Sequence, residues 1–209
     1  MDVKAFLDVL VEEIHSVVIA TTDENGLPCT RVIDMMMHDD DAVYFLTAKG
    51  KAFYKQLMEK PYVSLSGLTT GNGTMDKKSI SISGAIRNIG SEKLEEIFEK
   101  NPYMATIYPS DESRTALEVF CLYKGQGAYF DLSTKPITRG SFSLGGKTIQ
   151  NYGYFITEDC TGCGLCVEKC PQNCISVGEP YKINQDNCLH CGNCFSVCPE
   201  KAVIKTILN

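Results

Sequence analysis

Nine of the chain's eleven cysteines lie between positions 160 and 198, and this crowding constrains the fold of that region more than any other sequence feature. Eight of the nine form two copies of the pattern C-x-x-C-x-x-C-x-x-x-C-P, displaced by 28 residues. The copies are Cys160, Cys163, Cys166 and Cys170, and then Cys188, Cys191, Cys194 and Cys198. Such an internal duplication predicts two pseudo-symmetric halves packed on each other. Reduced cysteines bunched in this way are more often metal ligands than disulfides.

Each run has the bacterial spacing in which three cysteines bind one [4Fe–4S] cluster and the fourth binds the neighbouring cluster. Three thiolates two residues apart on a tight loop can reach three corners of one cubane. The fourth, expected at the start of a helix-like segment, points away from it. Residues 154–209 therefore resemble a two-cluster bacterial-type ferredoxin. The resemblance implies that Cys160, Cys163, Cys166 and Cys198 hold cluster one, and that Cys188, Cys191, Cys194 and Cys170 hold cluster two.

A pair of zinc sites is the alternative for these cysteines, because C-x-x-C pairs also bind zinc. Zinc sites normally use two pairs separated by a loop, whereas each run here has three closely spaced cysteines and then Cys-Pro. Nearby, Cys174 is expected to be a small buried residue, and His190 to tune or shield a cluster without binding it. Gly162, Gly164 and Gly192 are expected to let backbone amides approach the cluster sulfurs.

Composition argues against several other classes of protein. The formal net charge of −6 is unlike the basic surface of a nucleic-acid-binding protein. No apolar stretch approaches the roughly 18 residues of a membrane span, and the first residues lack the pattern of a signal peptide. We therefore expect a cytoplasmic protein without nucleic-acid or membrane partners. Its partner would be a redox protein or a small-molecule acceptor.

Residues 1–150 are expected to form an α+β domain ahead of the ferredoxin domain at 151–209. Apolar residues at helical spacing predict a helix over 3–14, and Asn25-Gly26 between two β-branched runs predicts a hairpin. Further helices are expected at 52–59 and, capped by Ser91, up to about residue 100. Strands are expected at 16–22, 30–37, 42–47, 62–68, 79–89, 118–122 and 127–132, with a connector at 133–153. Short strands joined by hairpins favour a closed or nearly closed antiparallel barrel.

The order of motifs in this first domain is similar to that of the pyridoxamine 5′-phosphate oxidase-like FMN-binding split barrels. The matching segments are Thr30–Ile33, Tyr44–Lys51 and Lys55–Leu65. In that family a strand carrying arginine and a Phe-x-Thr…Lys turn line the FMN site. The resemblance implies an antiparallel split β-barrel that binds FMN through Arg31, Val32, Ile33, Thr47, Lys49 and Lys51. Because these barrels usually dimerise with FMN at the subunit interface, it also implies a homodimer.

The residue types suit the chemistry of FMN. Its phosphate is a dianion, for which Arg31, Lys49 and Lys51 would be charge-assisted donors beside the Thr47 hydroxyl. The backbone of residues 31–33 offers amide donors and carbonyl acceptors to the edge of the isoalloxazine ring. The alternative for the lysines is a solvated face at the start of a helix. Arg87, on a later strand, is a weaker candidate.

Two [4Fe–4S] clusters and FMN together indicate an iron–sulfur flavoprotein oxidoreductase of anaerobic metabolism, because a flavin exchanges either one electron or two. One alternative is a flavoredoxin-like carrier between protein partners, and another is a ferredoxin with a docking domain that lacks FMN. The namesake activity of the barrel family is not expected. The chain has only four arginines, the last at Arg139, and has no Arg-x-His element near its C-terminus.

Overall fold

The computed structural model of the chain describes residues 2–148 and 151–208. These residues divide into two compact units. The first unit comprises 2–71, 79–129 and 142–148, and the second comprises 72–78, 130–141 and 151–208. Residues 130–141 therefore group with the cysteine-rich segment, although they precede it by some distance in the sequence.

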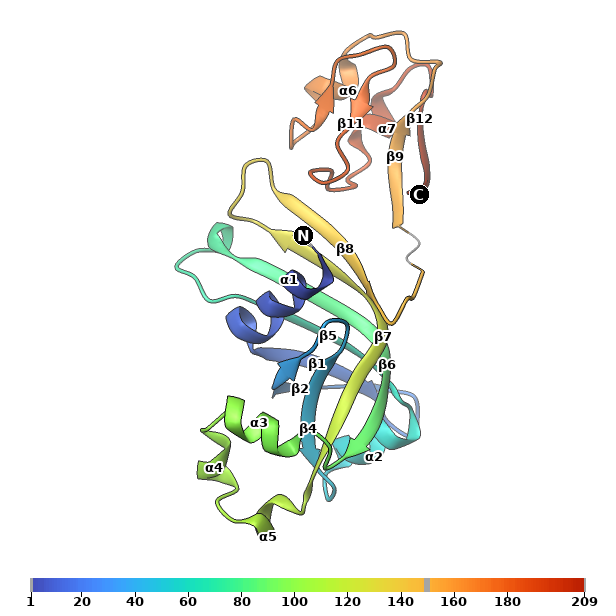
Figure 1. The fold of residues 1–209 in the computed structure, drawn as a ribbon. Helices are drawn as coiled ribbons and strands as arrows, with labels where there is room; N and C mark the ends of the chain where they lie inside the picture. The colour runs from blue at the N-terminus through green and yellow to red at the C-terminus, as the bar shows by residue number, and fades with distance from the viewer. Residues whose placement is uncertain (1, 149–150, 209) are drawn as a thin grey trace. The chain divides into compact units, whose positions relative to one another are not determined.

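A curled antiparallel sheet dominates the first unit (Figure 1). Its strand order is β2-β1-β5-β6-β7-β4-β3, and β8 pairs with β7. The elements of residues 3–144 are α1 (Val3–Asp8), η1 (Val9–Ile14), β1 (Ser16–Thr22), β2 (Pro28–Asp34), β3 (Met37–His38), β4 (Val43–Ala48), α2 (Ala52–Glu59), β5 (Tyr62–Leu68), η2 (Thr74–Asp76), β6 (Lys78–Gly90), α3 (Leu94–Lys100), α4 (Met104–Ile107), α5 (Asp111–Arg114), β7 (Leu117–Asp131) and β8 (Thr138–Leu144). Of these, η2 and residues 138–141 of β8 belong to the second unit. Only Met35 and Met36 separate β2 from β3, so the chain itself joins the two ends of the sheet. The expected nearly closed antiparallel barrel is confirmed.

Alternating burial fills the interior of the barrel. Val17, Ile19 and Thr21 of β1 are buried, whereas Val18 between them is 45% exposed. The long strands β6 and β7 approach closely at Gly84 and Gly125. A Cβ atom built on Gly84 would lie 2.6 Å from the Lys124 carbonyl oxygen, which leaves no room for a side chain. Glycine at this point allows the sheet to bend sharply enough to curl.

A helical insert covers part of the outer surface of the sheet. Helices α3, α4 and α5 form one group in Figure 1. Ile97 and Met104 of this insert are buried together with Tyr44 of β4 and Val119 of β7. Asn101 is buried as well, and its side-chain amide donates to the carbonyl oxygens of Met36 and Ile97, so that its polar group is satisfied.

The helix expected over 3–14 is present, but it changes at Val9 into a π-helix, η1, which ends at Ile14 with His15 as its C-cap. Other predicted details are wrong. Helix α3 begins after Lys93, not after the expected cap Ser91. The expected connector at 133–153 contains strand β8, which pairs with β7 and so gains backbone hydrogen bonds that local sequence does not reveal. The part of that connector at 149–150 lies outside the described residues.

The second unit contains the two halves of the cysteine repeat. Its elements are β9 (Asn151–Ile156), α6 (Leu165–Glu168), β10 (Ile175–Ser176), β11 (Lys182–Ile183), α7 (Asn193–Val197) and β12 (Val203–Leu208). Strand β9 pairs with β12, and β10 pairs with β11. Helices α6 and α7 begin after Gly164 and Gly192, which both have φ +81°. The two short helices therefore begin at equivalent positions of the 28-residue repeat.

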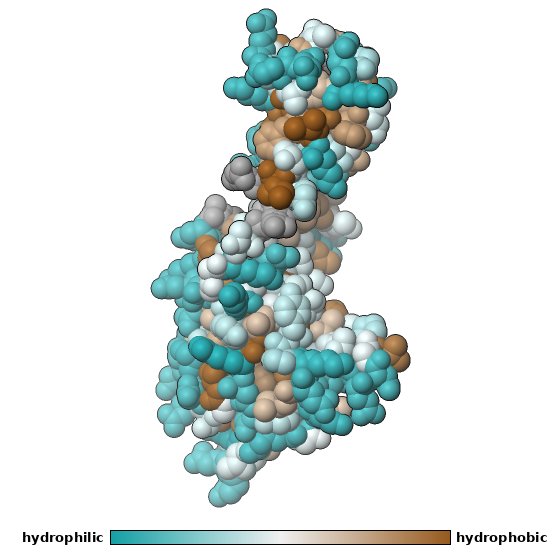
Figure 2. All heavy atoms as spheres, turned by 90° about the vertical axis from the view of Figure 1, so that its right-hand side faces the viewer, coloured by the Kyte–Doolittle hydropathy of each residue, from teal (hydrophilic) through white to brown (hydrophobic). Residues whose placement is uncertain are grey.

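The surface drawn in Figure 2 is mainly hydrophilic, with apolar side chains in small groups. No helix in the described part of the chain is long and apolar enough to cross a membrane.

A hydrogen-bonded group at the end of η1 ties the helical insert to β2. The Tyr103 hydroxyl donates to Asp34 Oδ2 at 2.7 Å, and the Ser16 hydroxyl donates to Asp34 Oδ1. His15 Nε2 lies 3.6 Å from Asp34 Oδ2. Burial acts to raise the pKa of Asp34, but the hydrogen bonds from Ser16 and Tyr103 and the nearby His15 hold it below its ordinary value.

Replacing Tyr103 by phenylalanine is expected to destabilise the first unit by about 1 kcal/mol at neutral pH, because the Asp34 carboxylate loses a donor. Partial exposure keeps the effect small. A lowered carboxyl pKa stabilises the fold above its unfolded value of about 3.9 and ceases to do so as the pH falls through the lower folded value. The difference should therefore shrink in acid. Urea unfolding followed by circular dichroism tests this, and equal stabilities at pH 7 would contradict it.

Candidate cluster cavities and flavin-binding residues

Two cavities of similar size lie in the second unit, and each is lined by four of the cysteines predicted to act together. One cavity is lined by Cys160, Cys163, Cys166 and Cys198. The other is lined by Cys170, Cys188, Cys191 and Cys194. Each cavity therefore takes three cysteines from one half of the repeat and the fourth from the other half. We call them cavity one and cavity two.

The fourth cysteine of each run follows a helix, contrary to the expectation that it begins one. Helix α6 ends at Glu168, two residues before Cys170, and α7 ends at Val197, directly before Cys198. Cys198 is extended, with φ −73° and ψ 112°. The cause is the following proline, which disfavours helical backbone at the residue before it. The chain changes direction at Cys198, and the Cys198 sulfur reaches the cysteines of the first half of the repeat.

The donor set of both cavities fits an iron–sulfur cluster. Burial raises the pKa of the Cys194 thiol to about 11 and also raises that of Cys166. Iron offsets this cost, because thiolates bind a cationic metal in their deprotonated form. Within the described residues, no three His, Cys, Asp or Glu side chains lie close enough together to hold a single metal ion. The cysteines of each set instead surround a cavity.

The neighbours of the cluster cysteines differ between the cavities. Cys174 is buried, lines cavity two, and has its sulfur 3.4 Å from that of Cys170, so cavity two has a fifth cysteine in its wall. His190 has φ +53°, and its Nε2 atom is buried without a hydrogen-bond partner among the described residues. Gly162 accepts a hydrogen bond from the Tyr181 hydroxyl through its carbonyl oxygen.

Arg139 is a further residue at cavity two that sequence reasoning did not find. It lies on β8 and donates from Nη1 to the carbonyl oxygen of Cys188 at 3.1 Å. Nothing in the cysteine pattern points to a residue 49 positions earlier in the chain.

In the first unit, Arg31 lies against the start of helix α2. Its guanidinium donates to the Thr21 hydroxyl at 2.7 Å and to Gln56 Oε1 at 2.9 Å, and it lies 4.3 Å from the centre of the Phe53 ring. Burial lowers the pKa of Arg31, but arginine remains charged at neutral pH. The structure therefore holds a cation in place beside the first turn of α2.

The other residues predicted to bind the phosphate lie at the end of β4 and in the turn that follows. Thr47 is buried and faces Glu118 of β7 across the sheet. Lys49 and Lys51 are exposed, and Lys51 directly precedes α2. Arg31 and Lys51 therefore both lie beside the start of α2, whereas Lys49 lies in the turn before it and lines the cavity that contains Glu118.

The backbone of β2 offers free hydrogen-bonding groups at Val32. Strand β2 is an edge of the sheet, paired only with β1. At the two ends of the β1–β2 ladder, the Met35 backbone amide donates to the His15 carbonyl oxygen, and the Asp23 backbone amide donates to the Leu27 carbonyl oxygen. Residues 15 and 35, and residues 23 and 27, are therefore hydrogen-bonded pairs. Such pairs alternate along an antiparallel ladder, so Arg31 and Ile33 also direct their backbone groups toward β1. Val32 directs its amide and carbonyl groups outward, whereas the sequence analysis expected all three residues to be available.

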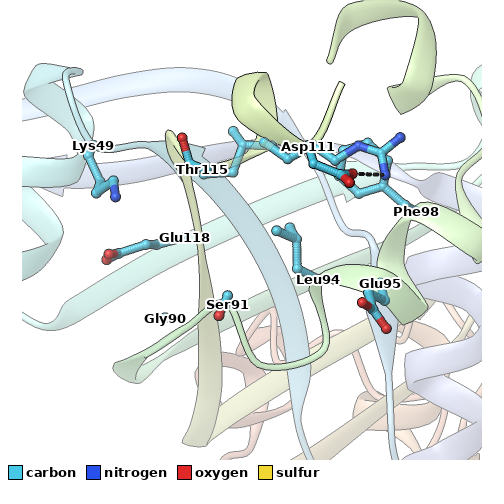
Figure 3. Close-up of a pocket in the computed structure, with 11 residues that line it drawn as sticks. Lys49, Gly90, Ser91, Leu94, Glu95, Phe98, Asp111, Thr115 and Glu118 are labelled. Carbon is cyan, nitrogen blue, oxygen red and sulfur yellow. Dashed lines mark ion pairs between the residues drawn. The ribbon is translucent and has the colours of Figure 1, made fainter. Parts of the chain in front are cut away.

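Figure 3 shows a cavity between the end of β4 and the helical insert, with Lys49 and Glu118 on one side of it and residues of α3 and α5 on the other. Glu118 accepts hydrogen bonds from Asn88 and from the Tyr54 hydroxyl, which hold its pKa below the ordinary value. Arg114 is paired with Asp111 at 3.6 Å. Val32 lines a different hollow, on the outer face of β1, β2, β5 and β6. Within one chain, Lys49 and Val32 thus line separate cavities.

Comparison with known families matches both parts of the chain. A family model for pyridoxamine 5′-phosphate oxidase matches residues 3–122, and one for a 4Fe–4S dicluster domain matches residues 159–202. The chain is also 26% identical over 102 residues to a pyridoxine/pyridoxamine 5′-phosphate oxidase from Bacteroides thetaiotaomicron. That alignment covers 48% of this chain and 46% of the relative, so the chain spans about half the length of that protein.

Solved structures share the fold of the first unit at low sequence identity. A NimC/NimA family protein from Clostridium acetobutylicum has a TM-score of 0.55 and 22% identity, over 68% of this chain and 92% of that one. A haem-binding protein from Mycobacterium smegmatis has a TM-score of 0.53 and 11% identity, over 66% and 56%. A C. acetobutylicum protein related to general stress protein 26 has a TM-score of 0.51 and 17% identity, over 66% and 94%. These likenesses show a common fold.

Proposed function

The chain belongs to the pyridoxamine 5′-phosphate oxidase family, and from that membership we propose that it is an iron–sulfur flavoprotein oxidoreductase that moves electrons between two [4Fe–4S] clusters and FMN. One observation carries the proposal: a barrel of this family is followed in the same chain by two cavities that are each lined by four cysteines. Because such thiolates must stay reduced, the proposal includes a cytoplasmic location.

In this proposal the cysteines that line cavity one hold cluster one and those that line cavity two hold cluster two. The Cys-Pro steps direct the fourth sulfur of each run to the other half. When bound, the clusters supply one-electron transfer. The protein supplies the thiolates, the backbone around them and the charges nearby, which set how readily each cluster is reduced.

For FMN, the proposed phosphate ligands are Arg31, Thr47, Lys49 and Lys51. Thr21 and Gln56 fix the Arg31 guanidinium before the flavin arrives, so little side-chain entropy is lost on binding. The free amide and carbonyl groups of Val32 are suited to the donor and acceptor atoms at the edge of an isoalloxazine ring. When bound, FMN supplies the exchange between one-electron and two-electron steps.

We favour an enzyme over a pure carrier, because the cavity in Figure 3, beside the proposed phosphate ligand Lys49, offers a small molecule a concave surface with fixed polar groups. The acceptor is proposed to be an organic compound other than pyridoxamine phosphate, because the chain lacks the Arg-x-His element of the namesake enzyme.

Anaerobic purification followed by assay of iron, sulfide and FMN tests this proposal. About eight irons, eight sulfides and one FMN per chain are expected. Iron at that level without FMN, and without uptake of added FMN, would contradict the flavoprotein and favour a ferredoxin with a docking domain. Two zinc ions in place of iron would contradict the clusters.

We also propose a homodimer that uses the outer face of β1, β2 and β5, where Val18, Val32 and Leu68 are exposed. Replacing Val18 and Leu68 together by glutamate is expected to give a monomer, because two charges would be buried in the interface. Light scattering after size-exclusion chromatography measures the mass. Ile107→Glu is the control, because Ile107 is an exposed apolar residue too, but lies on α4, outside the proposed interface. An unchanged mass in the double variant would contradict this interface.

A further inference from the structure

We propose that Arg139 makes the two clusters unequal, by raising the reduction potential of cluster two above that of cluster one. The inference rests on the proposed ligand sets and goes beyond the proposed function, because it says which cluster holds an electron that is given to the pair. The electron that reduces cluster two leaves cluster one oxidised, and no bond is made or broken.

Arg139 is held at cavity two by its backbone as well as by its side chain. Its amide donates to the carbonyl oxygen of Asp186 at 2.8 Å, and its Nη1 atom donates to the carbonyl oxygen of Cys188 at 3.1 Å. The guanidinium lies 5.3 Å from the centre of the Phe130 ring. A cation with this many contacts keeps a fixed position next to a cluster ligand.

The surrounding hairpin, residues 130–141, is fixed to both halves of the cysteine repeat, next to residues of cavity two. Ile137 donates from its backbone amide to Gln172 Oε1 at 2.8 Å, and its carbonyl oxygen accepts from Asn187 Nδ2 at 3.1 Å. Gln172 follows Cys170 by two residues, and Asn187 directly precedes Cys188. The hairpin therefore contacts chain segments beside two of the four cysteines that line cavity two.

The environment of Arg139 makes its charge effective. The side chain is half-buried, and its pKa is lowered by burial and partly raised again by Cys188. A charge that is partly removed from water acts on its neighbours through a lower effective dielectric constant. Because reduction adds a negative charge to a cluster, a fixed cation beside it favours the reduced form.

Neither cavity has a lysine or arginine among the described residues that line it, so the positive charge near cavity two comes from Arg139, which is bonded to the backbone of Cys188. Cavity one is instead lined by Glu200. Glu200 is exposed, so solvent weakens its effect, but its sign disfavours the reduced form of cluster one. The two cavities therefore have different charges near them. The main cause is Arg139, which lies in the 130–141 hairpin, outside the cysteine repeat.

Redox titrations of the full chain, monitored by electron paramagnetic resonance, test the inference with one cluster present at a time. Cys198→Ala leaves cluster two, and Cys194→Ala leaves cluster one. We expect cluster two to be reduced at least about tenfold more readily than cluster one, which is about 59 mV for a one-electron couple. Equal potentials, or a higher potential for cluster one, would overturn the proposal.

Adding Arg139→Gln to Cys198→Ala identifies the residue responsible. We expect Arg139→Gln to make cluster two about tenfold harder to reduce. Arg139→Lys keeps the charge and should restore most of the reduction potential of cluster two. Lys182→Gln is the control, because it removes an exposed charge from the same unit. A potential unchanged by Arg139→Gln, or lowered equally by Lys182→Gln, would overturn the role of Arg139. These potentials do not depend on FMN, so a missing flavin would contradict the proposed function without affecting this result.

Discussion

Replacing Cys198 by alanine is expected to remove cluster one and leave cluster two, so that iron falls from about eight to about four per chain. The reason is the crossed arrangement of the cysteines. Cys198 belongs to the second run in sequence but lines cavity one with Cys160, Cys163 and Cys166. Iron and sulfide assays give the cluster count, and electron paramagnetic resonance of the reduced protein shows which signal is lost.

The reciprocal variant must take account of Cys174, whose sulfur is 3.4 Å from that of Cys170. The double variant Cys170→Ala, Cys174→Ala is therefore expected to lose cluster two and keep cluster one. Cys174→Ala alone is the control and should keep both. Loss of cluster two, with cluster one intact, in Cys198→Ala would mean that each run binds its own cluster, which contradicts the crossed assignment.

Replacing Arg31 by glutamine is expected to weaken FMN binding by about tenfold to a hundredfold, since a charge-assisted hydrogen bond contributes about 1.5–3 kcal/mol. Arg31 is the most firmly held of the predicted phosphate ligands, through Thr21, Gln56 and the Phe53 ring. The affinity is measured by adding FMN to the flavin-free protein and following the loss of flavin fluorescence.

Arg87, the weaker candidate from the sequence, lies over the Tyr123 ring of β7, whereas Arg31 lies against the Phe53 ring of α2, so Arg87→Gln is the matched control. We expect it to leave FMN affinity within a few-fold of the wild type. Arg31→Lys should bind FMN between the two levels, because it keeps the charge but loses the paired geometry of the guanidinium. Unchanged affinity in Arg31→Gln, at unchanged thermal stability, would contradict the assignment of the phosphate site.

Much of the first unit could be predicted where local sequence decides the structure. Strands β1 and β5 and helix α2 have the predicted bounds, 16–22, 62–68 and 52–59. In β1 a β-branched run ends at the Asp23–Gly26 turn, and α2 ends before Pro61. The residues next to each element therefore determine where it ends. Family membership of both parts was also predicted, from motifs that have fixed spacing.

The features that were missed depend on contacts between distant segments. Strand β8 lies in a stretch rich in glycine, serine and proline, and it is a strand because β7 offers it a partner. The backbone groups of Val32 point away from β1, and those of Arg31 and Ile33 point toward it, because hydrogen-bonded and non-hydrogen-bonded pairs alternate along the β1–β2 ladder. The residue types alone do not decide which pairs are hydrogen-bonded. Arg139 reaches Cys188 only because residues 130–141 pack with the cysteine repeat.

An anaerobic reductive titration of the purified full chain tests the central claim most directly. Two clusters that each accept one electron and an FMN that accepts two predict an uptake of about four electrons per chain. Loss of the visible cluster and flavin absorbance should account for all four. Uptake of about two electrons, without any flavin absorbance change, would contradict an iron–sulfur flavoprotein.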